Sequence, residues 1–255
     1  MNGLFLTDRG QVRTHNEDAG GIYYNSHGQL LAVIADGMGG HKAGDVASQM
    51  ATAQIQEKWE KSNQLMSPED AENWLDHTIS EINTSIYKHA AHHEECQGMG
   101  TTIEAAICLK DFASIAHIGD SRLYLNDEEG FKQITEDHSL VNALVQSGQI
   151  SKDDAQEHPR RNVVLKALGT EEKVVPDVKT LSMDKGNKLL LCSDGLTDKV
   201  KDDELAAVIQ STMDMKDSGQ ELIDLANERG GEDNISLIII QYEKKDPSLE
   251  EGEIS

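Results

Sequence analysis

Two strand-like segments near the middle of the chain stand too close together for a helical crossover between them. Residues 112–119 and 121–125 are both rich in aliphatic side chains, and a single residue separates them. Parallel neighbouring strands need a connection of about a dozen residues or more. We therefore expect these two segments to pair antiparallel, and the sheet as a whole to be mostly antiparallel.

The order of the other segments favours an α+β architecture. Strand-like runs give way to two helical stretches, 43–59 and 68–93, and strands return before two further helices. Ser67 and Pro68 are typical of a helix start, as an N-cap and a proline in the first turn. Strands and helices do not alternate strictly, so we expect the helices to pack outside the sheet.

The charge of the chain excludes several classes of partner. Its 255 residues carry 46 acidic and 23 basic side chains, a formal net charge of −23. Such a field repels nucleic-acid backbones and anionic membrane surfaces. The N-terminus lacks the pattern of a signal peptide, and the apolar runs are too short to cross a bilayer. We expect no nucleic-acid or membrane partner.

The cysteines indicate a reducing compartment. Cys96, Cys108 and Cys192 are odd in number and widely spaced, which is typical of free thiols in a cytoplasm. None is followed six positions later by an arginine, so the loop of cysteine-dependent phosphatases is absent.

Acidic residues recur at the ends of apolar, strand-like runs. Near the N-terminus, Glu17 and Asp18 stand ahead of such a run. The other four are Asp36 after 30–35, Asp120 after 113–119, Asp194 after 188–192 and Asp233 just before 235–242. A strand that leads into a carboxylate can serve as a rigid arm that presents the acid to a ligand.

A turn is the alternative explanation for each acid, because Asp-Gly is a common turn dipeptide. After Asp36 and Asp194 the chain becomes glycine-rich or helical, which disfavours a hairpin at these two positions. Asp120 does lie in a segment that resembles a hairpin, and Asp233 could simply cap a turn. For these two acids the local pattern leaves both explanations open.

Carboxylates gathered near buried strand ends repel one another unless cations neutralise them. Mg²⁺ and Mn²⁺ prefer all-oxygen surroundings, whereas no cysteine pair or HExxH motif indicates zinc. His89, His92 and His93 could hold a transition metal, but a solvated helix end explains them better. The glycines of 37–44 match neither the P-loop nor the dinucleotide-binding pattern.

Eight short motifs follow one another along the chain. They are RTHNEDA (13–19), DGMGGHKAGDVAS (36–48), GMGTT (98–102), IGDSRLY (118–124), TEDHSL (135–140), HPRRNVVLKALG (158–169), LLLCSDGLTD (189–198) and EDNISLI (232–238). In this order they resemble the metal-dependent type-2C serine/threonine protein phosphatases in their compact bacterial form. The likeness runs from about residue 3 to residue 242, and the ordered set is far more specific than any single motif.

The resemblance implies two packed antiparallel β-sheets flanked by helices, in a single catalytic domain at 1–242. It also implies a flap at about 145–169, and we expect the acidic tail at 243–255 to be disordered. Arg160 and Arg161 make the flap locally basic. They could steer phosphorylated substrates or pair with nearby acids, and the sequence leaves both possibilities open.

The resemblance also implies a centre for two metal ions at one edge of the sheets. Asp36 would bridge both ions, and the carbonyl of Gly37 would join the first. Asp194 and Asp233 would bind the second ion. Asp120 would hold a third, looser ion, with help from Asp194.

The same resemblance implies supporting residues around the ions. Glu17 and Asp18 would contact the ions through water molecules or would support the residues that bind them. Arg13 would clamp the phosphate, since its guanidinium fork matches two phosphate oxygens. Some family members have a histidine two residues after the bridging aspartate, where this chain has Met38. That role therefore cannot be carried over, and His41 is the candidate proton donor in its place; a metal-bound water is the other possible source of the proton.

By resemblance, the sequence predicts a Mn²⁺- or Mg²⁺-dependent hydrolase of phosphoserine and phosphothreonine in proteins, with two ions per chain. Water activated by the ions would attack phosphorus directly, without a phosphoenzyme. The expected setting is a bacterial cytoplasm, in which a monomeric enzyme opposes a serine/threonine kinase. Two alternatives stay open: a hydrolase of small phosphate esters, and a catalytically silent binding module of the same fold.

Overall fold

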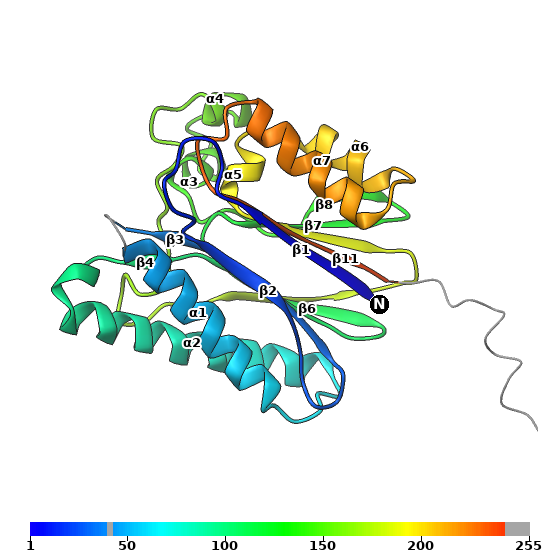
Figure 1. The fold of residues 1–255 in the computed structure, drawn as a ribbon, viewed down its shortest axis with the longest axis horizontal. Helices are drawn as coiled ribbons and strands as arrows, with labels where there is room; N and C mark the ends of the chain where they lie inside the picture. Colours follow the sequence, from blue (N-terminus) through cyan, green and yellow to red (C-terminus); the bar gives the residue numbers. More distant parts are fainter. Residues whose placement is uncertain (40–42, 243–255) are drawn as a thin grey trace, which may run out of the picture.

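Two antiparallel β-sheets lie face to face, and helices cover the outer face of each sheet (Figure 1). The computed structural model describes residues 1–39 and 43–242. The predicted fold of two packed antiparallel sheets flanked by helices is confirmed. The expectation for the tail at 243–255 lies outside the described residues. Among those that are described, no helix is both long and apolar enough to cross a lipid bilayer.

The strands divide between the sheets without regard to their order in the chain. In spatial order, the first sheet contains β1 (Asn2–Asp8), β11 (Ile235–Gln241), β10 (Lys188–Cys192), β7 (Arg122–Asp127) and β8 (Gly130–Gln133). The second contains β2 (Asp18–Tyr24), β3 (Leu30–Met38), β5 (Ile103–Cys108), β6 (Phe112–Ile118) and β9 (Asp177–Ser182), with the short β4 (Gly100–Thr101) beside β3.

Two groups of helices form the outer layers (Figure 1). The second sheet is covered by α1 (Ala43–Glu60) and α2 (Pro68–His92), and the first by α5 (Asp194–Thr197), α6 (Asp202–Gln210) and α7 (Met215–Glu228). The remaining helical segments are η1 (Glu94–Cys96), α3 (Leu140–Gln146) and α4 (Lys152–Gln156). Ser67 caps α2 as predicted, in a reciprocal capping box with Asp70.

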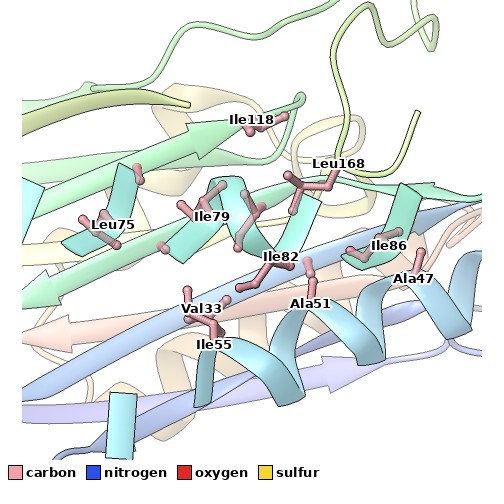
Figure 2. Packing of buried hydrophobic residues seen from close by; sticks show 14 of the residues in the cluster. Val33, Ala47, Ala51, Ile55, Leu75, Ile79, Ile82, Ile86, Ile118 and Leu168 are labelled. Carbon is pink, nitrogen blue, oxygen red and sulfur yellow. The ribbon is translucent and has the colours of Figure 1, made fainter. Parts of the chain in front are cut away.

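The unbroken apolar run at 30–35 follows from burial on both faces of β3. The odd-numbered residues of 31–35 pack in the core that contains α1 and α2, and the even-numbered residues of 30–34 face the first sheet. Figure 2 shows Val33 of β3 beside Ile55 of α1, with Ile82 of α2 nearby. Side chains alternate along a strand, so a strand between two apolar layers needs apolar residues at every position.

The predicted antiparallel pairing of 112–119 with 121–125 is wrong. β6 pairs with β5 and β9 in the second sheet, whereas β7 pairs with β10 and β8 in the first. The chain changes sheets at Gly119, whose φ of 115° favours glycine. A Cβ atom there would lie 2.5 Å from Thr102 Cγ2. The short connection therefore crosses between the sheets and carries Asp120 with it.

Replacing Ile82 by alanine should lower the free energy of unfolding by about 2–5 kcal/mol. Ile82 is fully buried between α2 and the second sheet, so truncation leaves a cavity that its neighbours fill only in part. Urea denaturation followed by circular dichroism measures the change. Val175→Ala is the control, because Val175 is 66% exposed, and it should cost less than about 0.5 kcal/mol. Equal losses in both variants would contradict this assignment of the core.

Candidate active site

The acids that the sequence singled out come together at one end of the sandwich. In an antiparallel pair, the end of one strand lies beside the start of its neighbour. β3 and β10 finish at this end, and β2, β7 and β11 begin there. Figure 1 shows the start of α1, α5 and the segment with α3 and α4 at the same end. The site thus draws on both sheets.

Asp36 lies within β3, two residues before the strand ends at Met38. The strand therefore continues past the acid at which the apolar run stops. Asp36 belongs to the even-numbered series of β3, which faces the first sheet. Its partner across the strand pair is Asp18 of β2. Two carboxylates on directly opposed positions destabilise a sheet unless their charge is offset.

Two threonines fix the backbone on both sides of Asp36. Thr102 N–H donates to the Asp36 carbonyl at 2.8 Å, and Thr101 Oγ1 donates to the same oxygen at 2.9 Å. Asp36 N–H donates to Thr102 Oγ1 at 2.9 Å. That hydroxyl also lies 2.8 Å from Ser121 Oγ. Thr102 therefore ties β3 to the crossover that carries Asp120.

Asp18 is buried and is held from the first sheet by Ser193. Ser193 Oγ donates to Asp18 Oδ2 at 2.8 Å, whereas Asp18 Oδ1 is buried without a hydrogen-bond partner in the described part of the chain. Burial raises the pKa of Asp18 to about 6, although the hydroxyls of Ser236 and Ser193 oppose the rise. Since Ser193 directly precedes Asp194, this bond joins β2 to the loop that presents a second acid.

Asp194 and Asp120 share their surroundings with Asp198. Asp194 begins α5, and Asp198 is the C-cap residue that follows the helix, one turn later. Burial raises the pKa of Asp194 well above its ordinary value, and Asp120 and Asp198 are the next causes. Burial also raises the pKa of Asp120 to about 6, with Asp137 adding to the rise. Asp198 is not among the acids expected from the sequence, although its spacing of four from Asp194 is a helical signal that indicates it.

Arg13 lies at the rim of this group and is bound to Asp233. Its Nη2 atom is 2.7 Å from Asp233 Oδ2, and its Nη1 atom is 4.0 Å from Glu17 Oε2. Burial lowers the pKa of Arg13, but Asp233, Glu17 and Asp36 together raise it, and the net shift is upward. The Arg13 side chain is 46% exposed.

Backbone atoms pack against Gly37 so closely that no side chain fits. A Cβ atom on Gly37 would lie 2.1 Å from the Gly44 carbonyl oxygen and 2.6 Å from that of Glu17. Gly37 N–H also donates to the Glu17 carbonyl at 3.1 Å. The end of β3, the segment with Glu17 and the start of α1 are therefore in direct contact. His41, the predicted proton donor, lies outside the described residues.

The segment 145–169, predicted to be a flap, is anchored at both of its roots. Ser139 pairs with Val164, and Leu168 pairs with Thr101 in isolated bridges. Between the roots, Arg161 Nε lies 3.9 Å from Asp198 Oδ2. Of the two explanations left open for the flap arginines, this contact favours pairing with acids in the case of Arg161.

The chemistry of the donor set at this end fits hard divalent cations. The pKa of Asp36 is raised well above its ordinary value, first by burial and then by Asp18, Asp194, Asp120 and Asp233. Oδ1 of Asp194, like that of Asp18, is buried without a partner in the described residues. In residues 1–39 and 43–242, no three His, Cys, Asp or Glu side chains already form a group able to hold an ion. The fit therefore rests on uncompensated charge and unpaired oxygens.

Comparison with known proteins decides the family. Residues 8–236 match the family described as Protein phosphatase 2C. The chain belongs to this family. The serine/threonine phosphatase stp of Listeria innocua is 44% identical over 241 residues, which cover 94% of this chain and 96% of that protein. This chain is thus a metal-dependent serine/threonine protein phosphatase.

Solved structures of the phosphatase 2C family superpose on the whole fold. The crystal structure of serine/threonine phosphatase Stp1 from Staphylococcus aureus has a TM-score of 0.91 at 43% identity, over 95% of both chains. The catalytic domain of PstP, solved in complex with two manganese ions, has a TM-score of 0.81 at 32% identity, over 93% of this chain and 96% of that one.

Replacing Asp120 by asparagine should stabilise the protein in a chelating buffer at neutral pH, and the gain should vanish in acid. Burial raises the pKa of Asp120 from 3.8 to about 6 in the folded state. As the pH rises from 3.8 to about 6, the unfolded chain loses this proton before the folded protein does, so the stability of the parent falls by roughly 1–3 kcal/mol and stays lower above that range. Below the ordinary pKa of 3.8 the carboxyl is protonated in both states and costs nothing.

Urea unfolding of parent and variant from about pH 4 to pH 7.5 measures this difference in stability. Asp111→Asn, at an exposed position, is the matched control and should show no such trend. A difference between parent and Asp120→Asn that stays constant with pH would show that Asp120 is not held in a strained, buried state.

Proposed function

We propose that the phosphatase hydrolyses phosphoserine and phosphothreonine esters with the help of Mn²⁺ or Mg²⁺ bound at the acidic end of the sandwich. The observation that carries the proposal is the meeting of Asp36, Asp194 and Asp233 from three separate segments. The Oδ1 atoms of Asp18 and of Asp194 are buried there without a hydrogen-bond partner among the described residues. Such a cluster is unfavourable by itself and favourable around cations.

The residues divide into those that would hold two ions and those that would support them. Asp36, the Gly37 carbonyl, Asp194 and Asp233 would hold the two ions. Asp120 would serve a third, looser position. When bound, such ions lower the pKa of a coordinated water and offset charge on the phosphate oxygens during in-line displacement.

Glu17 and Asp18 would bind the waters around the ions and not the ions themselves. Asp18 suits this purpose because Ser193 binds one of its oxygens, and the other has no hydrogen-bond partner in the part of the chain that the structure describes. No residue of the chain needs to attack phosphorus. The thiol of Cys108 is disfavoured as a nucleophile, because burial raises its pKa to about 12.

Arg13 would bind two phosphate oxygens of the substrate through its guanidinium fork. The bond to Asp233 Oδ2 uses Nη2, which keeps the guanidinium beside the candidate ligands until the phosphate arrives. His41 is proposed as the donor of a proton to the leaving serine or threonine oxygen.

The cellular setting proposed here is a bacterial cytoplasm, where the enzyme acts as a monomer and opposes a serine/threonine kinase. Its substrates are then phosphorylated proteins, including such a kinase. The relatives named above are serine/threonine phosphatases, which supports this substrate class.

Phosphate release from a phosphothreonine peptide tests the proposal. Release should require Mn²⁺ or Mg²⁺ and stop in chelator. It should fall more than about 100-fold in Asp194→Asn and Asp36→Asn, because mutating even a residue that only supports a metal ligand typically lowers metal affinity or activity about 10- to 100-fold. Asp111→Asn, at an exposed position, should keep full activity. Added Mn²⁺ should raise the melting temperature of the parent but not that of Asp36→Asn.

The same assay separates the alternatives. A small aryl phosphate turned over faster than the phosphopeptide would favour a hydrolase of small esters. A folded protein whose melting temperature rises with Mn²⁺, yet which releases no phosphate from any ester, would favour a silent binding module. Near-normal activity in Asp36→Asn would remove the metal mechanism.

A further inference from the structure

Both polar backbone groups of Gly119 are bound by one residue, His138. His138 N–H donates to the Gly119 carbonyl at 2.7 Å, and Gly119 N–H donates to His138 Nδ1 at 3.1 Å. Gly119 is the residue at which the chain leaves β6 for the other sheet, and Asp120 follows directly. His138 therefore fixes the backbone of the turn at Gly119, which precedes the candidate metal ligand Asp120.

The imidazole of His138 is itself held at its second nitrogen. His138 Nε2 lies 3.2 Å from Asp177 Oδ2, at the start of β9. Lys166 Nζ binds the other oxygen of Asp177 at 2.9 Å. Because Nδ1 accepts a hydrogen bond, the proton of the neutral ring is on Nε2 and is donated to Asp177. The carbonyl of His138 also accepts a hydrogen bond from Leu165 N–H at 2.7 Å. The end of segment 145–169 therefore lies next to His138.

The charges around His138 favour the neutral imidazole, which is the form that can accept the hydrogen bond from Gly119 N–H. Burial lowers the pKa of His138, and His117, whose ring centroid is 4.7 Å away, lowers it further. His117 Nδ1 lies 2.9 Å from Glu104 Oε2, with both side chains buried. Burial lowers the pKa of His117, but Glu104, Asp137 and the Glu136 backbone together raise it, and the net shift is upward. A positive His117 disfavours a second positive ring beside it.

We propose that His138 is a positioning residue: its Nδ1 bond to Gly119 sets where Asp120 stands, and thereby how tightly the ion at Asp120 is held. The second half of this inference rests on the proposed function of Asp120. His138 binds backbone and Asp177, not the candidate ligands of the two central ions. Its loss should therefore change the metal dependence of the reaction more than the rate at saturating metal.

Two substitutions separate the two nitrogens of His138. Asparagine places its amide oxygen near the position of Nδ1 and keeps an acceptor for Gly119 N–H. Glutamine places its polar group near the position of Nε2, keeps the contact with Asp177, and leaves Gly119 N–H without its acceptor. The pair is matched in polarity, and melting temperatures of both variants establish that they fold.

The first measurement is hydrogen exchange of the Gly119 amide by NMR, in chelator. His138→Gln should exchange this amide about tenfold faster than the parent, since one hydrogen bond is lost. His138→Asn should exchange it at the parent rate. Equal exchange in the parent and His138→Gln would overturn the positioning itself, and this result does not depend on any bound metal.

The second measurement is the Mn²⁺ concentration that gives half-maximal phosphate release. It should rise about tenfold in His138→Gln, while the rate at saturating Mn²⁺ changes less than about twofold; His138→Asn should stay near the parent. In an Asp120→Asn background, His138→Gln should add nothing, because residues that act through one another are not additive.

Two outcomes would contradict the metal half of the inference. If His138→Gln shifts the Mn²⁺ dependence as much in the Asp120→Asn background as in the parent, His138 does not act through Asp120. If Asp120→Asn by itself leaves the Mn²⁺ dependence unchanged, the proposed role of Asp120 is wrong. The activity of Asp36→Asn then still tests, independently, whether the two central ions are needed.

Discussion

Repulsion between carboxylates at one end of the sandwich is the constraint that the rest of this structure meets. Asp36 and Asp18 face each other across β3 and β2, and Asp194 and Asp120 raise the pKa of Asp36 further. Neutral groups could occupy these positions at lower cost to the fold. The apolar layers around β3 offset that cost by fixing the strands, so that charge which destabilises the fold is available for binding cations.

The hydrogen bonds around the site act mainly on backbone atoms. Thr101 and Thr102 hold the peptide groups on both sides of Asp36, and His138 holds those of Gly119. Asp18 and Asp233 are exceptions, since Ser193 binds one oxygen of Asp18 and both oxygens of Asp233 accept hydrogen bonds, from Arg13 and from the Asn234 N–H. Fixing the chain and not the charged atoms keeps a site rigid while its oxygens stay available to a ligand.

The sequence predicted the features that depend on local pattern and left out those that depend on packing. The runs that lead to Asp36 and Asp194 were visible because both are buried on two faces. The half-exposed edge strands β8 and β9 carry no such run and were missed. A Gly-Asp-Ser turn within one sheet looks the same in sequence as a crossing between two, so the pairing of β6 with β7 was mispredicted. His138 attracts notice only once Gly119 is seen beside it.

The division of the acids between the two sheets has a mechanical consequence. Asp18 and Asp36 belong to the second sheet, whereas Asp194 follows β10 and Asp233 precedes β11 in the first. The thickness of the side-chain layer between the sheets therefore sets the distance between the two halves of the site. A bulkier residue at Ala32 or Ala106, both in that layer, would move the two groups of acids apart without contacting any of them.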